Sequence, residues 1–244
     1  MVIVKDQMDP DLRKNINKQK FAAIIPIGSI EQHGSHLPIS TDSDIVTEIA
    51  TRISEKCNFL LLPTLSYGVS FEHAPFFNLS LKNKTLEQVL IDICLSLSSN
   101  GIDSIFIING HHGNQKALNN IGTKINKFSK KKIKIFVFSY WHFMRHEFDH
   151  AGFVETSLML AISNKVKMNR AKKGLITKNL SENEKSRLTK LASKSFPTVT
   201  KNGVWGDPTM STAKDGRNFL AEIVRNLTKK SQTCLTDKSR KLHH

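Results

Sequence analysis

Residues 28–42, Gly-Ser-Ile-Glu-Gln-His-Gly-Ser-His-Leu-Pro-Ile-Ser-Thr-Asp, place carboxylates and imidazoles close together in the chain. Glu31 and His33 are two positions apart, so in extended backbone their side chains point the same way and can reach one site. Asp42 stands at an expected helix start, where backbone N–H groups favour an ionised carboxylate. These residue types together can hold a divalent metal ion. The alternative is that Asp42 only caps a helix beside polar surface residues.

Two later segments add the same residue types. Residues 109–114, Asn-Gly-His-His-Gly-Asn, follow an apolar run, and their glycines allow a tight turn that presents an imidazole. Adjacent side chains diverge in extended backbone, so we expect at most one of His111 and His112 to be a ligand. Residues 149–157 lead into an apolar helix and place Glu155 at its start. A polar glycine turn and an ordinary helix cap are the respective alternatives.

The three segments together supply three carboxylates and two imidazoles: Glu31, His33, Asp42, His111 and Glu155. This mixture suits Zn²⁺ or Mn²⁺, with iron as a third candidate, and excludes both a thiolate zinc site and an all-oxygen calcium cage. Five ligands exceed the three of a simple catalytic zinc site. If one carboxylate bridges, two metals roughly 3.5–4 Å apart fit the set, and a shared hydroxide becomes the nucleophile.

Strands and helices are expected to alternate in the first 160 residues, which predicts an α/β fold around a mainly parallel sheet. The carboxyl ends of such strands are where ligands bind, and the first two metal-binding segments directly follow apolar runs. Residues 164–200 are rich in lysine and too weakly periodic to define an element. The strands are predicted at residues 21–27, 59–62, 102–108 and 133–138, and the helices at 42–56, 85–97, 118–128, 155–163 and 212–229.

The composition of the 244 residues, 39% hydrophobic and 23% charged, is that of a folded globular protein. The polar N-terminus lacks a secretory signal, no apolar run could span a membrane, and three scattered cysteines form no disulfide framework. We therefore expect a cytoplasmic protein. One domain is predicted over residues 1–235, with a tail over residues 236–244 whose final two histidines have the form of an expression tag.

These segments resemble those of the creatininase (creatinine amidohydrolase) family of metal-dependent amidohydrolases. Residues 31–42 match its Glu-x-His-Gly-x-His-Leu-Pro-x-x-Thr-Asp signature at every fixed position. Residues 109–114 match Asn-Gly-His-x-Gly-Asn, and residues 150–157 match His-Ala-Gly-x-x-Glu-Thr-Ser. Two further stretches look like family segments, residues 67–73 and 203–208.

The resemblance extends over residues 21–227 and implies a three-layer α/β/α fold assembled as a homo-oligomer, often a hexamer. It implies that one metal is held by Glu31, Asp42 and His111. It implies that the other is held by His33, Asp42 and Glu155, with Asp42 bridging the two ions. His150 matches a family histidine that carries protons beside the substrate, so we expect His150 and Glu155 to be catalytic. Further contacts to the substrate are expected from His36, His73, Trp141 and Asp207.

Two departures from the creatininases themselves make creatinine a doubtful substrate. Creatininases carry a metal-binding Glu where this chain has Gly113, so the fifth ligand is assigned to Glu155. Their long Trp-bearing flap is also absent, because His150 follows Trp141 after only nine residues. We therefore expect an enzyme that hydrolyses a C–N amide bond in a small cyclic amide or formamide by a metal-activated hydroxide, with His150 protonating the leaving nitrogen.

The strongly basic charge offers a second hypothesis. The formal net charge is +15, and residues 161–244 hold 19 basic and 6 acidic side chains. This region could bind a polyanion such as nucleic acid, with the metal site vestigial. However, the region is poor in aromatics, and its lysines are scattered rather than gathered in a stripe. A solvated lysine-rich surface is therefore the favoured interpretation, and nucleic acid is not expected to be a partner.

Overall fold

A single parallel sheet forms the middle layer of the computed structural model, which describes residues 2–236. Its strands lie in the order β1-β3-β2-β4-β5, and every neighbouring pair is parallel. Because the strands are parallel and in register, with Ala23 opposite both Leu60 and Ile105, their carboxyl ends meet at one edge of the sheet. The strands are β1 (Val2–Ile3), β2 (Ala23–Ile27), β3 (Leu60–Leu61), β4 (Ser104–Asn109) and β5 (Lys134–Ser139).

The central strands are apolar on both faces because both faces are covered by helices. Along β4, Phe106 and Ile108 belong to one core cluster, whereas Ile105 and Ile107 belong to the cluster on the opposite face. This alternation follows from the two-residue period of a strand. A continuous apolar run in the sequence is therefore the mark of a strand buried between two layers.

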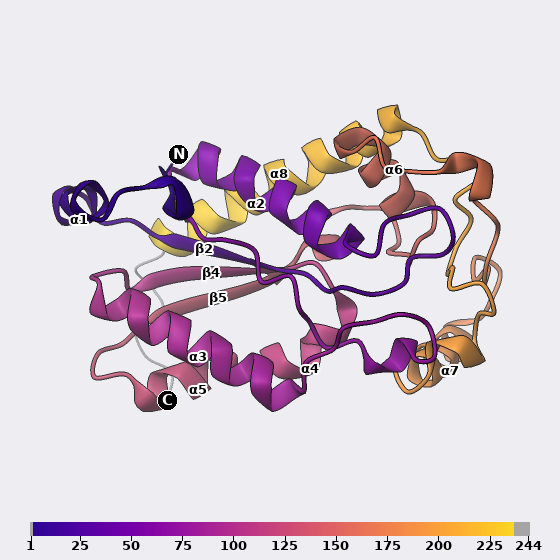
Figure 1. Ribbon diagram of the computed structural model, residues 1–244, viewed down its shortest axis with the longest axis horizontal. Helices are drawn as coiled ribbons and strands as arrows, with labels where there is room; N and C mark the ends of the chain where they lie inside the picture. The colour runs from indigo at the N-terminus through magenta and orange to yellow at the C-terminus, as the bar shows by residue number, and fades with distance from the viewer. Residues whose placement is uncertain (1, 237–244) are drawn as a thin grey trace.

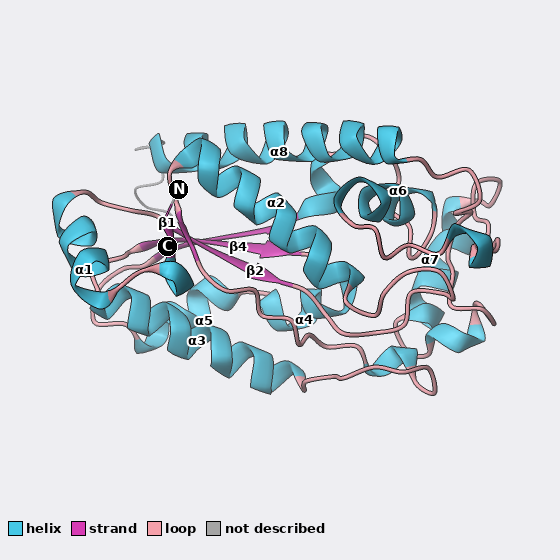
Figure 2. Ribbon diagram, turned by 45° about the horizontal axis from the view of Figure 1, so that its top comes forward, coloured by secondary structure: helices cyan, strands magenta, loops and turns pink. Residues whose placement is uncertain are grey.

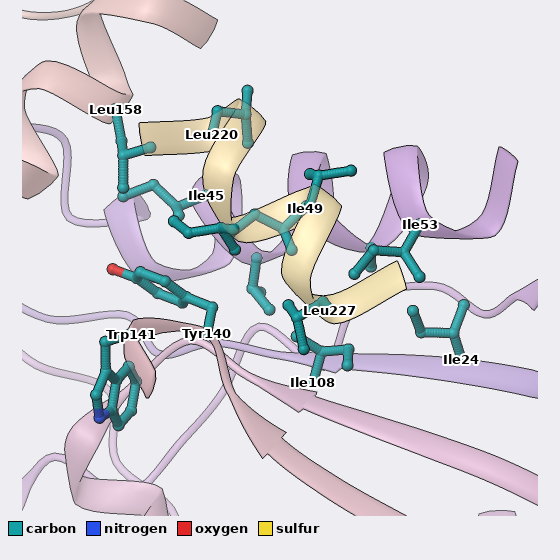
Figure 3. Packing of buried hydrophobic residues seen from close by; sticks show 14 of the residues in the cluster. Ile24, Ile45, Ile49, Ile53, Ile108, Tyr140, Trp141, Leu158, Leu220 and Leu227 are labelled. Atoms are coloured by element: carbon teal, nitrogen blue, oxygen red, sulfur yellow. The ribbon is translucent and has the colours of Figure 1, made fainter. Parts of the chain in front are cut away.

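The first helical layer consists of α2 (Thr41–Cys57), α6 (Phe153–Ile162) and α8 (Ala213–Thr236). Ile45, Ile49 and Ile53 recur at helical spacing on α2 and face α8 and the sheet (Figure 3). All three side chains are buried, so this stripe holds α2, with the metal-binding segment at its start, in a fixed position.

The second helical layer covers the other face of the sheet and contains α3 (Asn83–Ser99), α4 (Gln115–Leu118) and α5 (Ile121–Phe128) (Figures 1 and 2). The three-layer α/β/α arrangement expected from the sequence is confirmed. The expected helix at 118–128 is divided, because Asn120, between α4 and α5, adopts a left-handed conformation with a φ of 55°.

Two helices were not predicted: α1 (Asp9–Lys18) and α7 (Glu182–Ala192). Neither has a fully developed apolar stripe, since α1 buries no side chain and α7 buries only Ala192. Helix α7 begins with a capping box in which the Ser181 hydroxyl accepts the Glu184 N–H and the Glu184 carboxylate accepts the Ser181 N–H. Short 3-10 helices occur at Val4–Asp6, Phe71–His73, His112–Asn114, Tyr140–Phe143, Met168–Arg170 and Phe196–Thr198.

Two expectations concern the ends of the chain and the membrane. Apart from Thr236, the last residue of α8, the expected tail over residues 236–244 lies outside the described residues. Within residues 2–236, no helix combines the length and the apolar character needed to cross a membrane.

Candidate metal centre

The five predicted ligands converge where the carboxyl ends of β2 and β4 meet the starts of two helices. Glu31 and His33 follow β2, and His111 follows β4. Asp42 lies in the first turn of α2, and Glu155 lies in the first turn of α6. The topology therefore brings together residues that are separated by more than a hundred positions in the sequence.

The first group of ligand atoms belongs to Glu31, Asp42 and His111, which lie within 4.8 Å of one another. His111 Nδ1 is 3.0 Å from Asp42 Oδ2, and His111 Nε2 is 3.2 Å from Glu31 Oε2. The Nε2 atom is also 2.8 Å from the Val69 carbonyl oxygen, to which it donates. In the neutral ring the Nδ1 lone pair therefore faces the Asp42 carboxylate, so both groups can donate electron pairs to one cation.

The second group consists of His33, Asp42 and Glu155, again within 4.8 Å. His33 Nδ1 donates to the Glu31 carbonyl oxygen at 3.1 Å, so its Nε2 faces the carboxylates, 3.2 Å from Asp42 Oδ1 and 3.6 Å from Glu155 Oε2. The Ala151 N–H holds Glu155 Oε2 at 2.7 Å. Asp42 is the one residue that this group shares with the first group. A carboxylate that bridges two ions would have to belong to both groups.

The carboxylates of the centre strongly favour positive charge on the two predicted histidine ligands. Burial alone would lower the pKa of His33, but Asp42, Glu155 and Glu31 raise it to about 10. The pKa of His111 is likewise raised to about 10, since Glu31 and Asp42 outweigh its burial. Burial raises the pKa of Glu155 to about 8, whereas the pKa of Asp42, despite its burial, is lowered by the two histidines.

Unpartnered oxygen atoms show that these residues fit a metal site. Among the described residues, Glu31 Oε1 and Oε2, Asp42 Oδ2 and Glu155 Oε1 are buried and accept no hydrogen bond. A buried carboxylate oxygen without a donor is costly, so each of these atoms requires a partner from outside the chain. Divalent ions supply that partner for a set of three carboxylates and two imidazoles.

Local packing explains why glycine occupies position 113. A Cβ there would lie against the Val69 carbonyl oxygen and 2.5 Å from His111 Nε2. The Asn114 amide ties the same loops together, because its oxygen accepts the Val69 N–H at 2.9 Å and its nitrogen donates to the Gly28 carbonyl at 3.0 Å. The loop around Val69 therefore closes onto the metal centre, and position 113 has no space for a side chain.

A cavity of about 730 Å³ opens above the centre and includes Glu31, Asp42, His111 and Glu155 in its wall. His73 and His150 also line it, and both rings rest against Phe196, with centroids 4.6 and 4.8 Å away. Burial and the neighbouring His33 hold the pKa of His150 well below its usual range. The remaining wall includes Glu72, Phe148, Asp149, Lys185, Lys194 and Trp205.

Three predicted substrate contacts are not among the described residues that line the cavity. His36 is buried and its Nε2 lies 2.9 Å from the Thr156 hydroxyl. Trp141 is buried against Phe148, with ring centroids 4.7 Å apart. Asp207 pairs with Lys173 at 3.1 Å on a partly exposed surface. Their expected roles in substrate binding stay predictions.

Several wall residues were missed by the sequence reasoning. Lys185 belongs to α7, and Phe196 begins the 3-10 helix that follows it. The pattern Ser181-x-x-Glu184 was the available signal, because it marks a helix start in a region without clear apolar periodicity. No local pattern indicates that this helix covers the opening above the metal centre.

Comparison with known proteins agrees with this geometry. The sequence model of the creatininase family, described as creatinine amidohydrolase, matches residues 6–230. A mycofactocin precursor peptide peptidase of Mycobacterium ulcerans is 30% identical over 217 residues, which cover 82% of this chain and 80% of that protein. A 2-amino-5-formylamino-6-ribosylaminopyrimidin-4(3H)-one 5'-monophosphate deformylase of Methanosphaera stadtmanae is 35% identical over 116 residues, 45% of this chain and 48% of that one.

The fold is also shared with solved structures. A creatininase variant described as the Zn-Zn type superposes with a TM-score of 0.78 at 21% identity, covering 93% of this chain and 96% of that one. At this identity the likeness shows the fold, and the match to the family model shows the relationship. The chain therefore belongs to the creatininase family of metal-dependent hydrolases that act on C–N amide bonds.

Proposed function

We propose that the protein hydrolyses a C–N amide bond, in a small cyclic amide or formamide, at a centre of two divalent metal ions. The observation that carries this proposal is the convergence of five buried predicted ligands at the floor of a cavity, with four of their carboxylate oxygens lacking a hydrogen-bond partner. A single ion would leave some of these oxygens unsatisfied. Zn²⁺ and Mn²⁺ are the proposed ions, because the set mixes imidazole nitrogen with carboxylate oxygen.

The two groups divide the ligands between the proposed ions. Glu31, Asp42 and His111 would hold one ion, and His33, Asp42 and Glu155 the other. Bound there, the ions would supply an activated water and polarise the carbonyl of the substrate. The chain's own residues then exclude bulk water and place the amide over this floor.

His150 is the proposed carrier of the proton to the leaving nitrogen. Its Nδ1 lies 3.9 Å from Glu31 Oε1, at the boundary between the ligands and the cavity. An amide nitrogen is too basic to leave as an anion, so it must gain a proton as the C–N bond breaks. The half-buried ring, packed against Phe196, is held where this transfer can occur.

A peptide is the second candidate substrate. The cavity volume of about 730 Å³ falls in the range of pockets that enclose ligands much larger than creatinine. The relative that aligns over most of this chain is described as a precursor peptide peptidase, and a second relative is described as a deformylase. Both names describe cleavage of an amide bond, so both substrate classes belong in the test.

The test is to strip the protein of metal, reload it with Zn²⁺ or Mn²⁺, and assay a panel of cyclic amides, formamides and short peptides. We expect metal-dependent turnover of one of these substrate classes. For creatinine we expect a kcat/KM far below about 10⁴ M⁻¹s⁻¹, the lower end of the ordinary enzyme range. Two equivalents of bound metal by elemental analysis would support the paired centre. Turnover that is unchanged in the stripped protein would contradict the proposal.

Assembly as a homo-oligomer, with a hexamer as the specific expectation, is proposed on the family resemblance and on exposed apolar side chains. Tyr67, Phe71 and Phe77 are each more than half exposed and lie within one short segment beside the cavity. Large exposed aromatics commonly mark surfaces that are covered in an assembly. Light scattering of the purified protein measures the assembly directly, and a monomeric mass would contradict this proposal.

A further inference from the structure

The side chain of Gln32 lies between the two cavity histidines although it is not one of the predicted ligands. Its Nε2 atom is 3.0 Å from His73 Nδ1 and 3.1 Å from His150 Nε2, and the residue is buried. We propose that Gln32 is a positioning residue: its carboxamide fixes the tautomer of His73 and holds His73 and His150 in register with the metal ligand Glu31. The proposed contribution to catalysis rests on the function proposed above.

The orientation of the carboxamide is determined by its oxygen. The Gly34 N–H donates to Gln32 Oε1 at 3.0 Å. Gly34 adopts φ +62°, a conformation that favours glycine and turns this N–H back toward residue 32. Gly203, at φ +73°, lies so close to the same oxygen that no side chain fits there. With the oxygen held on this side, the NH₂ group must face the histidines.

The NH₂ group in turn determines where His73 carries its hydrogen. An amide nitrogen only donates, so His73 Nδ1 must accept and the ring hydrogen must be on Nε2. Nε2 lies 3.1 Å from Glu31 Oε1, so the ring nitrogen that carries the hydrogen is the one next to this carboxylate. The opposite tautomer would direct a nitrogen lone pair at the same carboxylate and disfavour the geometry in which Glu31 can bind a metal.

The NH₂ group also lies within hydrogen-bond distance of His150. His150 Nε2 lies 3.1 Å from both the side-chain nitrogen and the main-chain oxygen of Gln32. Gln32 therefore offers this ring nitrogen a donor and an acceptor at equal distance. The centroids of the His73 and His150 rings are 5.0 Å apart, and both rings also contact Phe196, so the Gln32 carboxamide links two imidazoles that lie side by side.

Three variants separate hydrogen bonding from space filling. Gln32→Met keeps the length of the side chain and removes its donors and acceptor. Gln32→Glu keeps the acceptor for the Gly34 N–H but offers only acceptors to both histidines, so it should move the His73 hydrogen to Nδ1. Gln88→Met is the matched control, because Gln88 is exposed on α3 and bonds only to Asp92 at 2.8 Å.

The first measurement needs no substrate. Solid-state ¹⁵N spectra of histidine-labelled, zinc-loaded protein report which ring nitrogen carries hydrogen, and a His73→Gln variant identifies the signals of His73. We expect Nε2–H in the wild type and a shift toward Nδ1–H in Gln32→Glu. Zinc affinity should fall roughly 10–100-fold in Gln32→Glu, the usual effect of losing a group that orients a metal ligand. The Gln88→Met control should match the wild type.

The second measurement uses whichever amide is turned over by the metal-loaded enzyme. For Gln32→Met we expect kcat to fall roughly 10–100-fold with KM nearly unchanged, and the loss should not add to that of His73→Gln in the double variant. An Nδ1–H tautomer for His73 in the wild type would overturn the proposal, as would wild-type zinc affinity in Gln32→Glu. Absence of amide turnover would count against the proposed function alone, because the tautomer and the zinc affinity are measured independently.

Discussion

The middle of the sheet and the loop that follows strand β2 are equally buried, but the first is apolar and the second carries ionisable side chains. In the middle of the strands, Ile25 and Ile107 lie side by side on β2 and β4 and are 0% exposed. Beyond the carboxyl ends of the same strands, Glu31 and His33 are also 0% exposed. The chain thus carries apolar and ionisable groups at the same depth, a few residues apart in the sequence.

The difference lies in what each region needs from outside the chain. Apolar side chains gain roughly 25 cal/mol per Å² of buried surface wherever they pack well, so the middle of the sheet is satisfied by the protein itself. Buried carboxylates lose their hydration, and that cost is offset only by charges and hydrogen bonds at the site. Cations bound at the edge of the sheet would supply the partners that its buried carboxylate oxygens lack.

The largest effect that would distinguish the two regions is expected from Asp42→Ala. Asp42 is the residue shared by both ligand groups, so its loss should abolish binding of both ions and with it turnover. Elemental analysis and activity provide the measurement. Asp44→Ala is the control two positions along α2, because Asp44 accepts from the Ser40 hydroxyl at 2.9 Å and belongs to neither group. Full metal content in Asp42→Ala would show that the bridging assignment is wrong.

A second pair of variants sharpens the division of roles within the polar region. His150→Ala should retain both ions and lower kcat roughly 10²–10⁴-fold, the usual contribution of general acid–base catalysis. Glu155→Ala should instead lose the ion of the second group, because its carboxylate is one of the three ligands there. Circular dichroism verifies folding, and metal analysis separates the cases. Metal loss in His150→Ala to the same extent would make His150 a ligand.

In the apolar region, Ile49→Ala should affect stability and spare the metals. Ile49 is fully buried in the cluster between α2 and α8, so the cavity left behind should lower the free energy of unfolding by about 2–5 kcal/mol. Ile176→Ala is the matched control, because this side chain is 48% exposed, and it should change the free energy of unfolding by about 0.5 kcal/mol. Urea unfolding provides the measurement. Loss of metal from folded Ile49→Ala would show that the two regions are coupled.

The smallest effect is expected at the basic surface. Lys172 and Lys178 are exposed, and replacing both with alanine should change the free energy of unfolding by about 0.5 kcal/mol or less at each site and leave turnover unchanged. The wild-type protein should also elute from immobilised nucleic acid at low salt. Retention that falls steeply with salt, with a slope reflecting several phosphates, would instead favour the polyanion hypothesis.

Much of the metal centre could be predicted from the sequence because its determinants are local. Glu31 and His33 share a side of the chain through the two-residue period of extended backbone, and Asp42 follows from a helix start. The apolar runs before the first two segments predict buried parallel strands, whose carboxyl ends must meet at one edge. The convergence of Glu31, His33, Asp42 and His111 therefore follows from period, polarity and topology, whereas Glu155 is brought to them by the packing of α6.

Only the tertiary structure decided which other side chains face the cavity. His36 and His73 are alike as sequence features, yet His36 contacts Thr156 outside the wall while His73 lies beside Glu31. Helix α7 forms part of the wall through Lys185, although its sequence buries almost no apolar surface. The role inferred for Gln32 depends on Gly34 and on contacts far along the chain. Local patterns determine the period and direction of side chains, whereas their partners depend on how separate elements pack in three dimensions.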